Sequence, residues 1–475
     1  MKIDLKSLNI EKVHNSFLTG EYTVKDLTEA YLGVIKEKNE VINAYLEVFY
    51  NDIDSQIEIA DKMFKNGTAT LMTGIPIAIK DNTLFEGHIS SAGSKMLENY
   101  VATYDSFVVK KLKEEGAIIL GRTNMDEFAM GSSTQTSAFG VTRNPYDITR
   151  VPGGSSGGPA AAVAGDMALA SLGTETCGSV RQPASFCGLV GIKPTYGAVS
   201  RSGIIAMGSS LDQVGPMTKT VTDAEILYNT ISGKDLLDST SLTDEFKSTV
   251  EKSIFKKKIG VPRAFLNGGG INEEVLKNFE ICCEKLKNAG YEIVDVVSDT
   301  MKYSLAVYYI IMPAEASTNL ARYDGIRYGL SVDAPNLYDV YTKSKGKGFG
   351  KEVRRRLLLG AYILSHGFKE AYYRKALNVR DMIAKELLEI FEQVDVFITP
   401  TVPFPAFKLG EKMDDPLAMY MNDIFSAPAN LTGVPAISIP SGITKEGLPL
   451  GLQITAPYLR EDILFSIGKE FEKLV

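Results

Sequence analysis

The 475-residue sequence contains few histidines and few cysteines. Its three histidines are His14, His88 and His366, so the commonest base of serine hydrolases is scarce. Zinc motifs of the H-E-x-x-H or paired C-x-x-C type are absent. Four cysteines, of which Cys282 and Cys283 are adjacent, are too few for a disulfide framework in so long a chain. We therefore expect reduced thiols, no metal site and a cytoplasmic protein.

The sequence also lacks an excess of positive charge and a long apolar run. With 51 Lys and Arg against 58 Asp and Glu, the net charge is −7, which argues against a nucleic-acid-binding surface on this chain. No apolar run approaches about 18 residues, and residues 1–17 show no apolar core of a secretory signal. No membrane association is expected. The composition, 44% hydrophobic and 23% charged, is typical of a globular protein with a large core.

Hydrophobic periodicity predicts a single domain over residues 1–475. Residues 1–65 are expected to be a helical N-terminal segment, in which Thr23 caps a helix. Residues 66–230 alternate short apolar runs with glycine-rich turns and form the expected core. Residues 231–390 are predicted to be a mainly helical excursion, and residues 391–475 return to strands. Strands near both ends predict the α/β class, with a large mixed β-sheet surrounded by helices.

Two glycine-rich segments with serines are the candidate catalytic elements. The segment GGSSGG, residues 153–158, matches the G-x-S-x-G pattern at both Ser155 and Ser156. The hydrolase elbow also needs a histidine downstream, and the one available, His366, stands in a predicted helix. Ser156 is expected to cap the helix that follows it. The second segment, GTETCGSVRQPASFCG at residues 173–188, places a cysteine and a serine two positions apart.

A neutral lysine is the alternative base, because a serine hydroxyl is a weak nucleophile at its own pKa. Lys80 ends the alternating segment GIPIAIK, in which Ile75, Ile77 and Ile79 share one face and Lys80 lies on the other with Ala78. Burial must lower the lysine pKa by about 3 units from about 10.4, a shift that apolar sites achieve. The sequence thus favours Lys80 as a buried base over a lysine that reaches solvent.

These segments resemble the amidase signature hydrolases. The resemblance rests on GIPIAIKDN, on GGSSGGPAAAVAG and on GSVRQPASFCGLVGIKPTYG. The later segments EASTNLARYDGIRYG, GFGKEVRRRLLLGAYILS and YMNDIFSAPANLTGVPAISIPSG resemble the branch that forms A subunits of tRNA-dependent amidotransferases. The likeness extends from about residue 20 to about residue 470. It implies the amidase signature fold and a Ser–cis-Ser–Lys triad, with Ser179 as nucleophile, Ser155 as bridging serine and Lys80 as base.

The resemblance also assigns an oxyanion hole to the backbone N–H groups of Thr176, Cys177, Gly178 and Ser179. The family usually has D-[TI]-G-G-S where this chain reads E-T-C-G-S, so Cys177 replaces a glycine that could adopt a positive φ. The Cys177 thiol is therefore a rival nucleophile, but it needs an electropositive setting and has only Arg181 close by in sequence. We expect Ser179 to attack and Cys177 to be a tolerated small side chain.

The implied reaction is hydrolysis of glutamine through an acyl-Ser179 intermediate. In the branch that the chain resembles, ammonia passes to a B subunit, which uses ATP and Mg²⁺ to convert Glu-tRNA(Gln) to Gln-tRNA(Gln) or Asp-tRNA(Asn) to Asn-tRNA(Asn). A small C subunit completes the heterotrimer. The tRNA is held mainly by the partner, and no cofactor is expected in this chain.

A glutamine site needs one cation for the α-carboxylate and one anion for the α-ammonium group. The resemblance places Arg356 and Asp423 in these roles and adds Tyr309; Arg355 and Tyr308 are equally placed neighbours. Two other functions stay open. One is a stand-alone amidase acting on a small aliphatic or aryl amide, and the other is a non-catalytic interaction protein.

Overall fold

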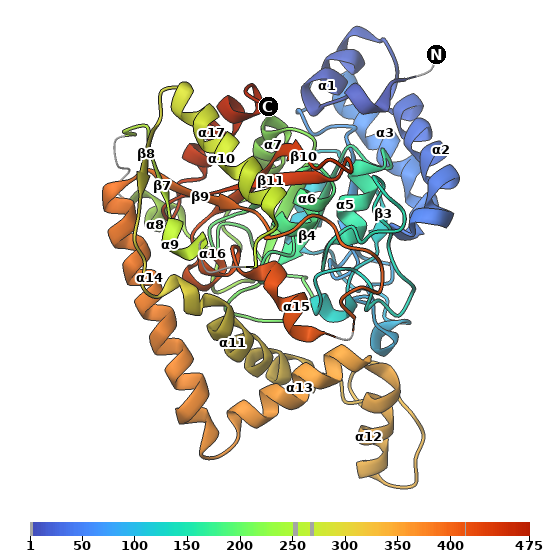
Figure 1. The fold of residues 1–475 in the computed structure, drawn as a ribbon. Helices are drawn as coiled ribbons and strands as arrows, with labels where there is room; N and C mark the ends of the chain where they lie inside the picture. Colours follow the sequence, from blue (N-terminus) through green and yellow to red (C-terminus); the bar gives the residue numbers. More distant parts are fainter. Residues whose placement is uncertain (1–2, 250–254, 267–269, 414) are drawn as a thin grey trace.

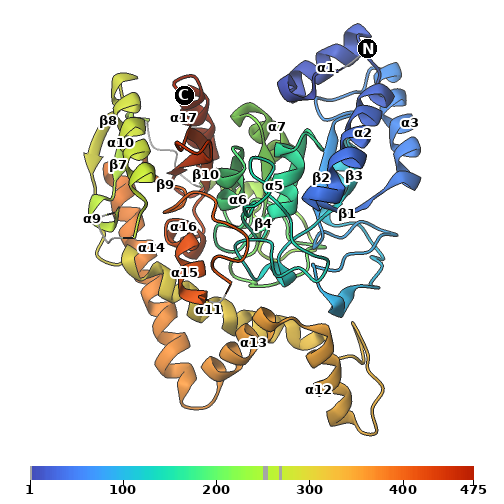
Figure 2. The same cartoon turned by 45° about the vertical axis from the view of Figure 1, so that its right-hand side comes forward.

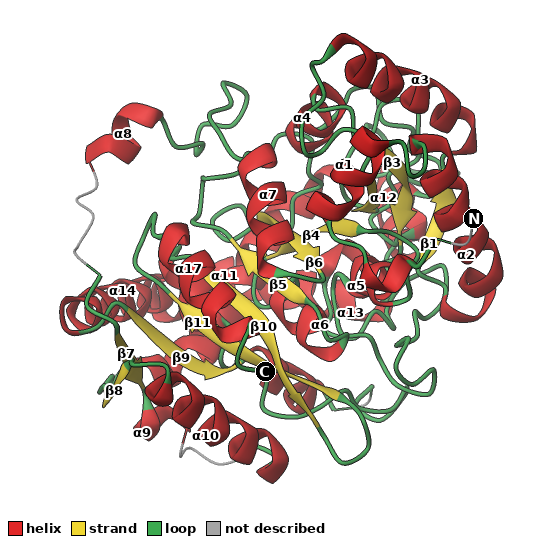
Figure 3. Cartoon of the chain, turned by 90° about the horizontal axis from the view of Figure 1, so that it is seen from above, coloured by secondary structure: helices red, strands yellow, loops and turns green. Residues whose placement is uncertain are grey.

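The computed structural model describes residues 3–249, 255–266, 270–413 and 415–475. In these ranges the strands form one eleven-stranded mixed sheet in the order β1-β3-β2-β4-β6-β5-β10-β11-β9-β7-β8, surrounded by helices (Figure 1). Seen from above, the strands cross the molecule as one band (Figure 3). This arrangement confirms the predicted α/β class.

The strands are β1 (Tyr45–Val48), β2 (Pro76–Lys80), β3 (Ile118–Thr123), β4 (Ala170–Glu175), β5 (Val190–Lys193), β6 (Gln213–Thr218), β7 (Lys258–Val261), β8 (Glu292–Asp295), β9 (Val396–Pro400), β10 (Ala436–Ile443) and β11 (Pro449–Thr455). The α-helices are α1 (Ile10–Thr19), α2 (Val24–Ile42), α3 (Tyr50–Asn66), α4 (Phe107–Glu114), α5 (Gly157–Ala164), α6 (Arg181–Phe186), α7 (Val221–Ile231), α8 (Asp244–Thr249), α9 (Arg263–Leu266), α10 (Glu273–Asn288), α11 (Ser304–Asn319), α12 (Leu337–Gly348), α13 (Lys351–Leu364), α14 (Lys375–Gln393), α15 (Pro416–Tyr420), α16 (Ala427–Thr432) and α17 (Glu461–Glu472). Among the described residues, none of these helices is long and apolar enough to cross a membrane.

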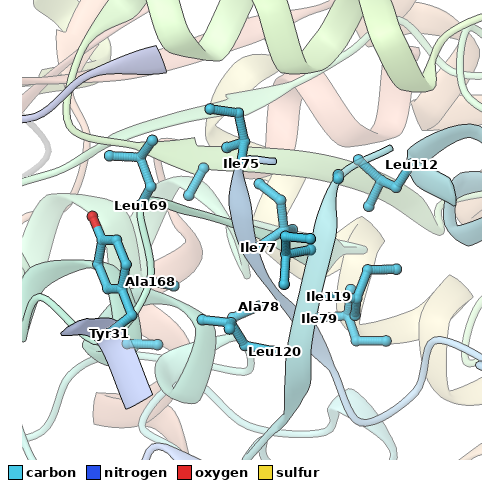
Figure 4. Close-up of a cluster of buried hydrophobic side chains, with 14 of the residues drawn as sticks. Tyr31, Ile75, Ile77, Ala78, Ile79, Leu112, Ile119, Leu120, Ala168 and Leu169 are labelled. Atoms are coloured by element: carbon cyan, nitrogen blue, oxygen red, sulfur yellow. The ribbon is translucent and has the colours of Figure 1, made fainter. Parts of the chain in front are cut away.

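Strand β2 lies in the interior of the sheet and determines where Lys80 is held. It pairs in parallel with β3 on one side and with β4 on the other. Ile75, Ile77 and Ile79 are fully buried, and Figure 4 shows them in an apolar cluster with Leu112 and other side chains. Each such isoleucine contributes about 1.5–3 kcal/mol by burial. The apolar packing therefore fixes the strand, and Lys80 ends it inside the protein.

The N-terminal segment is helical as expected, but it also contains a strand. Thr23 caps α2 as predicted: its side chain accepts a hydrogen bond from the N–H of Asp26, and the Asp26 carboxylate accepts from the N–H of Thr23. Between α2 and α3, however, the short strand β1 pairs antiparallel with β3 at the sheet edge. A four-residue strand of this kind is decided by its partner strand rather than by local periodicity.

The segment expected to be a mainly helical excursion contains strands β7 and β8, which extend the sheet beyond β9. Its helices α12, α13 and part of α14 project from the body of the molecule (Figures 1 and 2). The expectation that His366 lies within a helix is wrong. Helix α13 ends at Leu364, and His366 lies in an exposed turn where Gly367 has φ +83°.

Candidate active site

Lys80 lies among hydroxyl groups at the carboxyl end of β2. Its Nζ donates to Ser155 Oγ at 2.7 Å and to Ser156 Oγ at 2.8 Å. It also lies 2.9 Å from Thr174 Oγ1 and 3.1 Å from the Thr174 carbonyl oxygen. Because β2 and β4 are parallel neighbours, their carboxyl ends meet and bring Lys80 beside Thr174. The structure thus joins the two segments that contain Lys80 and Ser155.

The environment of Lys80 favours a neutral amine. The side chain is fully buried, and the partners of its Nζ are hydroxyl and carbonyl oxygens rather than a carboxylate. Burial lowers the pKa of Lys80 from 10.5 to about 7, although the more distant charges of Asp126, Asp212 and Glu175 act in the opposite direction. A neutral amine at this position has a lone pair that can accept a proton from a hydroxyl group.

Ser156 has a different role from the one expected. It occupies the position before α5, but its side chain makes no capping hydrogen bond to that helix. Its Oγ instead accepts from Lys80 Nζ and donates to the Thr174 carbonyl oxygen at 3.0 Å. The backbone of Ser156, at φ −95° and ψ 43°, is not in the extended conformation usual for a cap. The expectation of a helix cap is therefore wrong, and Ser156 is a second hydroxyl partner of Lys80.

The turn at residues 176–179 follows β4 directly and contains Ser179. The N–H of Ser156 donates to the carbonyl oxygen of Ser179 at 3.2 Å, which ties this turn to the segment with Ser155. The peptide bond between Gly154 and Ser155 is cis. Within the described parts of the chain, the N–H groups of residues 176–179 donate to no acceptor. Four unpaired N–H groups in a buried turn are unusual, and they form a site suited to an anionic oxygen.

A buried ion pair holds both ends of this turn. Glu175 accepts from the N–H groups of Val180 and Arg181, at 3.0 and 3.1 Å, and from the Arg181 guanidinium group. Arg181 also donates to Gln453 and to the carbonyl oxygen of Ser426. Burial alone raises the pKa of Glu175, but the Arg181 charge and these hydrogen bonds outweigh it, so the pKa lies below its ordinary value. Glu175 is therefore charged and neutralises Arg181.

Cys177 and Gly178 differ in backbone conformation within the turn. Gly178 has φ +79°, whereas Cys177 is not among the residues with positive φ. A Cβ on Gly178 would lie 2.6 Å from Ser426 Oγ and 3.3 Å from Asp423 Oδ1, so only glycine fits there. Cys177 needs no such freedom, and its side chain is buried. Burial and the nearby Asp423 raise the pKa of the Cys177 thiol, which keeps it protonated.

The three residues assigned to a substrate site lie together. The Tyr309 hydroxyl donates to Asp423 Oδ2 at 2.8 Å, and the Arg356 guanidinium carbon lies 5.6 Å from the centre of the Tyr309 ring. Of the two neighbouring arginines, Arg356 is 3% exposed and Arg355 is partly exposed at its side chain. Tyr308 instead places its hydroxyl 3.2 Å from Thr176 Oγ1. The neighbours Arg355 and Tyr308 thus have different surroundings from Arg356 and Tyr309.

The charges of Arg356 and Asp423 are incompletely neutralised. Arg356 Nε donates to Glu352 at 2.6 Å; among the described residues, its terminal nitrogens have only the Met312 sulfur, 4.0 Å from Nη1. No ion pair within those residues joins Arg356 to Asp423. Burial raises the pKa of Asp423 to about 7, although the Tyr309 hydroxyl and Arg356 act to lower it. A ligand with one carboxylate and one ammonium group would satisfy both.

A cavity of about 280 Å³ adjoins this cluster, lined by Glu127, Gly131, Ser132, Ser133, Thr136, Lys351, Glu352, Arg355, Arg356, Lys412, Met413, Met419 and Tyr420. Asp126 connects its wall to the serine segment. The Asp126 carboxylate accepts from the N–H of Ser133 at 3.1 Å, and the Asp126 N–H donates to the carbonyl oxygen of Ser155 at 3.2 Å. Asp126 thus links Ser133 in the cavity wall to Ser155 by two hydrogen bonds.

A sequence model of the family described as Amidase matches residues 26–465. The chain belongs to the amidase family. The match spans the glycine-rich serine segments, Lys80 and the later strands, so it confirms the resemblance inferred from these motifs. Amidase family membership also agrees with the large mixed sheet.

Several relatives and solved structures are similar to this chain over nearly its whole length. It is 48% identical over 475 residues to the A subunit of glutamyl-tRNA(Gln) amidotransferase from Caldanaerobacter subterraneus subsp. tengcongensis, covering 99% of this chain and 97% of that protein. The crystal structure of the corresponding A subunit from Thermotoga maritima is 42% identical, with a TM-score of 0.78 and coverage of 99% and 94%. The peptide amidase from Stenotrophomonas maltophilia is 26% identical, with a TM-score of 0.80 and coverage of 99% and 97%.

Among the described residues, the ring contacts of the histidines do not involve the Lys80 cluster. His88 is bonded to Glu47 and Asp52, 3.1 and 2.8 Å from its ring nitrogens. In the described ranges, no group of three or more His, Cys, Asp or Glu side chains is arranged to hold a metal ion.

Sequence reasoning missed Thr174 and Tyr420. Thr174 reaches Lys80 because β4 lies beside β2, and Tyr420 reaches the arginines because α15 lies against α13. No local sequence pattern could have identified either residue.

Proposed function

We propose that this chain is the glutaminase subunit of a tRNA-dependent amidotransferase. The observation that carries the proposal is the pair of incompletely neutralised charges, Arg356 and Asp423, with Asp423 close to Gly178 in the turn that contains Ser179. The same chain holds a buried lysine bonded to serine. An α-amino acid with a side-chain amide matches this pair, because its α-carbon carries both a carboxylate and an ammonium group. The 48% identity to an amidotransferase A subunit over the whole chain agrees with that substrate class.

The proposed chemistry begins with the proton of Ser179. Ser179 Oγ attacks the γ-carbonyl carbon of glutamine while its proton passes to Ser155 Oγ, and Ser155 passes its own proton to neutral Lys80. A hydroxyl group suits this relay because it donates and accepts at once. The 2.7 Å contact between Lys80 and Ser155 supports the second transfer.

The tetrahedral intermediate carries a negative oxygen, and the unpaired N–H groups of residues 176–179 would stabilise it. Loss of one such donor typically costs about 10²–10³ in rate. Collapse of the intermediate breaks the C–N bond, and the relay runs backward to return the proton to the departing ammonia. Water then attacks the acyl-Ser179 ester by the same route and releases glutamate.

In the complete enzyme, the ammonia would serve a B subunit that consumes ATP and Mg²⁺ to amidate Glu-tRNA(Gln) or Asp-tRNA(Asn). A C subunit would complete the heterotrimer, in the cytoplasm, and the tRNA would be held mainly by the partner. The net charge of −7 on this chain supports that last point. The names of the relatives support Glu-tRNA(Gln) as the substrate of the complex.

The proposal is tested by trapping the acyl-enzyme. The chain, co-purified with its partner subunits, is mixed with glutamine and quenched in acid, and the adduct is located by peptide mass spectrometry. We expect a glutamyl adduct on Ser179 that is lost in Lys80→Met. Lys193→Met is the matched control, because Lys193 is also fully buried but its amine bonds Pro194 and Gln213. An adduct on Cys177 would contradict the proposed nucleophile.

A stand-alone amidase is the second candidate function, and the fold shared with a peptide amidase supports it. The two functions differ in the use of Arg356 and Asp423. If the wild-type protein acylates with butyramide or a simple aromatic amide but not with glutamine, the second function replaces the first.

A further inference from the structure

The wall of the cavity beside Arg356 contains an aromatic residue without an assigned role. Tyr420 is the last residue of α15 and lies three positions before Asp423. Its ring stacks on the ring of Tyr309, with centroids 3.6 Å apart and an angle of 23° between the planes. It also lines the cavity. Tyr420 therefore contacts the assigned substrate cluster through the face of the Tyr309 ring.

Tyr420 also lies against two guanidinium groups. The guanidinium carbon of Arg356 is 5.6 Å from the centre of the Tyr420 ring, and that of Arg355 is 5.4 Å away. Arg355 donates to the Tyr420 hydroxyl, and both arginines bond Glu352. The phenol is thus fixed at its oxygen by Arg355 while its ring lies against Arg356.

We propose that Tyr420 is a positioning residue that makes the site selective for amides bearing an α-carboxylate. The inference rests on the proposed glutamine specificity. Arg356 is the buried cation of the cluster, and the rings of Tyr309 and Tyr420 both lie within 5.6 Å of its guanidinium carbon. Two aromatic rings restrict the orientation of the guanidinium plane and exclude water from it. The terminal nitrogens then point toward the ligand instead of toward solvent.

The role of Tyr420 is separable from the chemistry of the serines. Tyr420 contacts Tyr309, Arg355 and Arg356, and none of its described contacts reaches Lys80, Ser155 or the turn at residues 176–179. Loss of the ring should therefore weaken recognition of the carboxylate without slowing the acylation of an amide that lacks it. A stacked ring pair and a partly desolvated cation–π contact together account for an effect of about 10-fold.

The test compares Tyr420→Leu with the wild type, each co-purified with its partner subunits, on glutamine and on 4-aminobutanamide. The second amide keeps the amine and the amide but lacks the carboxylate. We expect Tyr420→Leu to raise KM for glutamine about 10-fold with kcat changed less than about 2-fold. For 4-aminobutanamide, kcat/KM should change less than about 2-fold, which also shows that the variant is folded.

Tyr420→Phe keeps the ring and should restore KM for glutamine to within about 3-fold of the wild type. Arg355→Met, which removes the partner of the phenol and leaves the ring in place, should give an intermediate KM. An equal loss of kcat/KM on both amides in Tyr420→Leu, or no change on either, overturns the inference. If the wild-type protein itself hydrolyses 4-aminobutanamide as well as glutamine, the proposed glutamine specificity has failed instead.

Discussion

The pH dependence of kcat/KM is the prediction that follows most directly from the buried charges. Two buried groups must be deprotonated for glutamine hydrolysis. Lys80 must be neutral to accept a proton, and Asp423 must be charged to bind an ammonium group. Burial places the pKa of each at about 7. Both groups lose a proton as the pH rises. The active fraction of the enzyme is the product of the two deprotonated fractions, so their effects on kcat/KM multiply.

The magnitude follows from two ionisations near pH 7. Each required form has a fraction of about 0.9 at pH 8 and about 0.1 at pH 6. For glutamine, kcat/KM should therefore fall about 100-fold from pH 8 to pH 6. For butyramide, which has no ammonium group, only Lys80 matters and the fall should be about 10-fold. The measurement is ammonia release at substrate concentrations well below KM, in quenched samples at fixed ionic strength.

Asp423→Asn is the control for this experiment. The variant should have a lower kcat/KM for glutamine at pH 8, and its remaining decrease to pH 6 should be about 10-fold, as for butyramide. A constant rate with butyramide between pH 6 and pH 8 would refute Lys80 as a base with a pKa near 7. Equal slopes for both amides in the wild type would refute the ionisation of Asp423.

Three further predictions concern the turn after β4. Cys177→Gly should leave kcat/KM for glutamine within about 3-fold, with the acyl adduct still on Ser179, because the thiol is protonated; loss of the adduct would contradict this. Gly178→Ala should lower kcat at least about 100-fold in a protein with an unchanged circular dichroism spectrum, since the new Cβ would meet Ser426. Arg181→Met should lower the free energy of unfolding by about 3–5 kcal/mol in denaturant titration, because Glu175 is left buried and unpaired. An unchanged unfolding midpoint would mean that the ion pair does not hold the turn.

Much of the fold was predictable because its signals are local. The alternating isoleucines of β2, the Thr23 cap of α2 and the apolar strands β9, β10 and β11 are recorded in short windows of sequence, and the structure confirms them. Strand β1 and the turn at His366 were not predicted. A strand of four residues acquires its conformation from hydrogen bonds to β3, and a helix end depends on the packing of the turn that follows.

For the candidate site, the sequence by itself determined which chemical groups are available: a lysine at the end of an apolar strand, serines among glycines, and almost no histidine. Only the tertiary structure decided how they are used. In the folded protein, the Ser156 hydroxyl bonds Lys80 instead of capping its helix. Arg356 is buried while Arg355 is partly exposed, and Tyr309 bonds Asp423 while Tyr308 lies against Thr176. Neighbouring residues on a helix point in different directions, so packing decides that Arg356 is buried against the Tyr309 ring while Arg355 stays partly exposed. Burial, which lowers the pKa of Lys80 and raises that of Asp423, exists only once distant elements of the chain have come together.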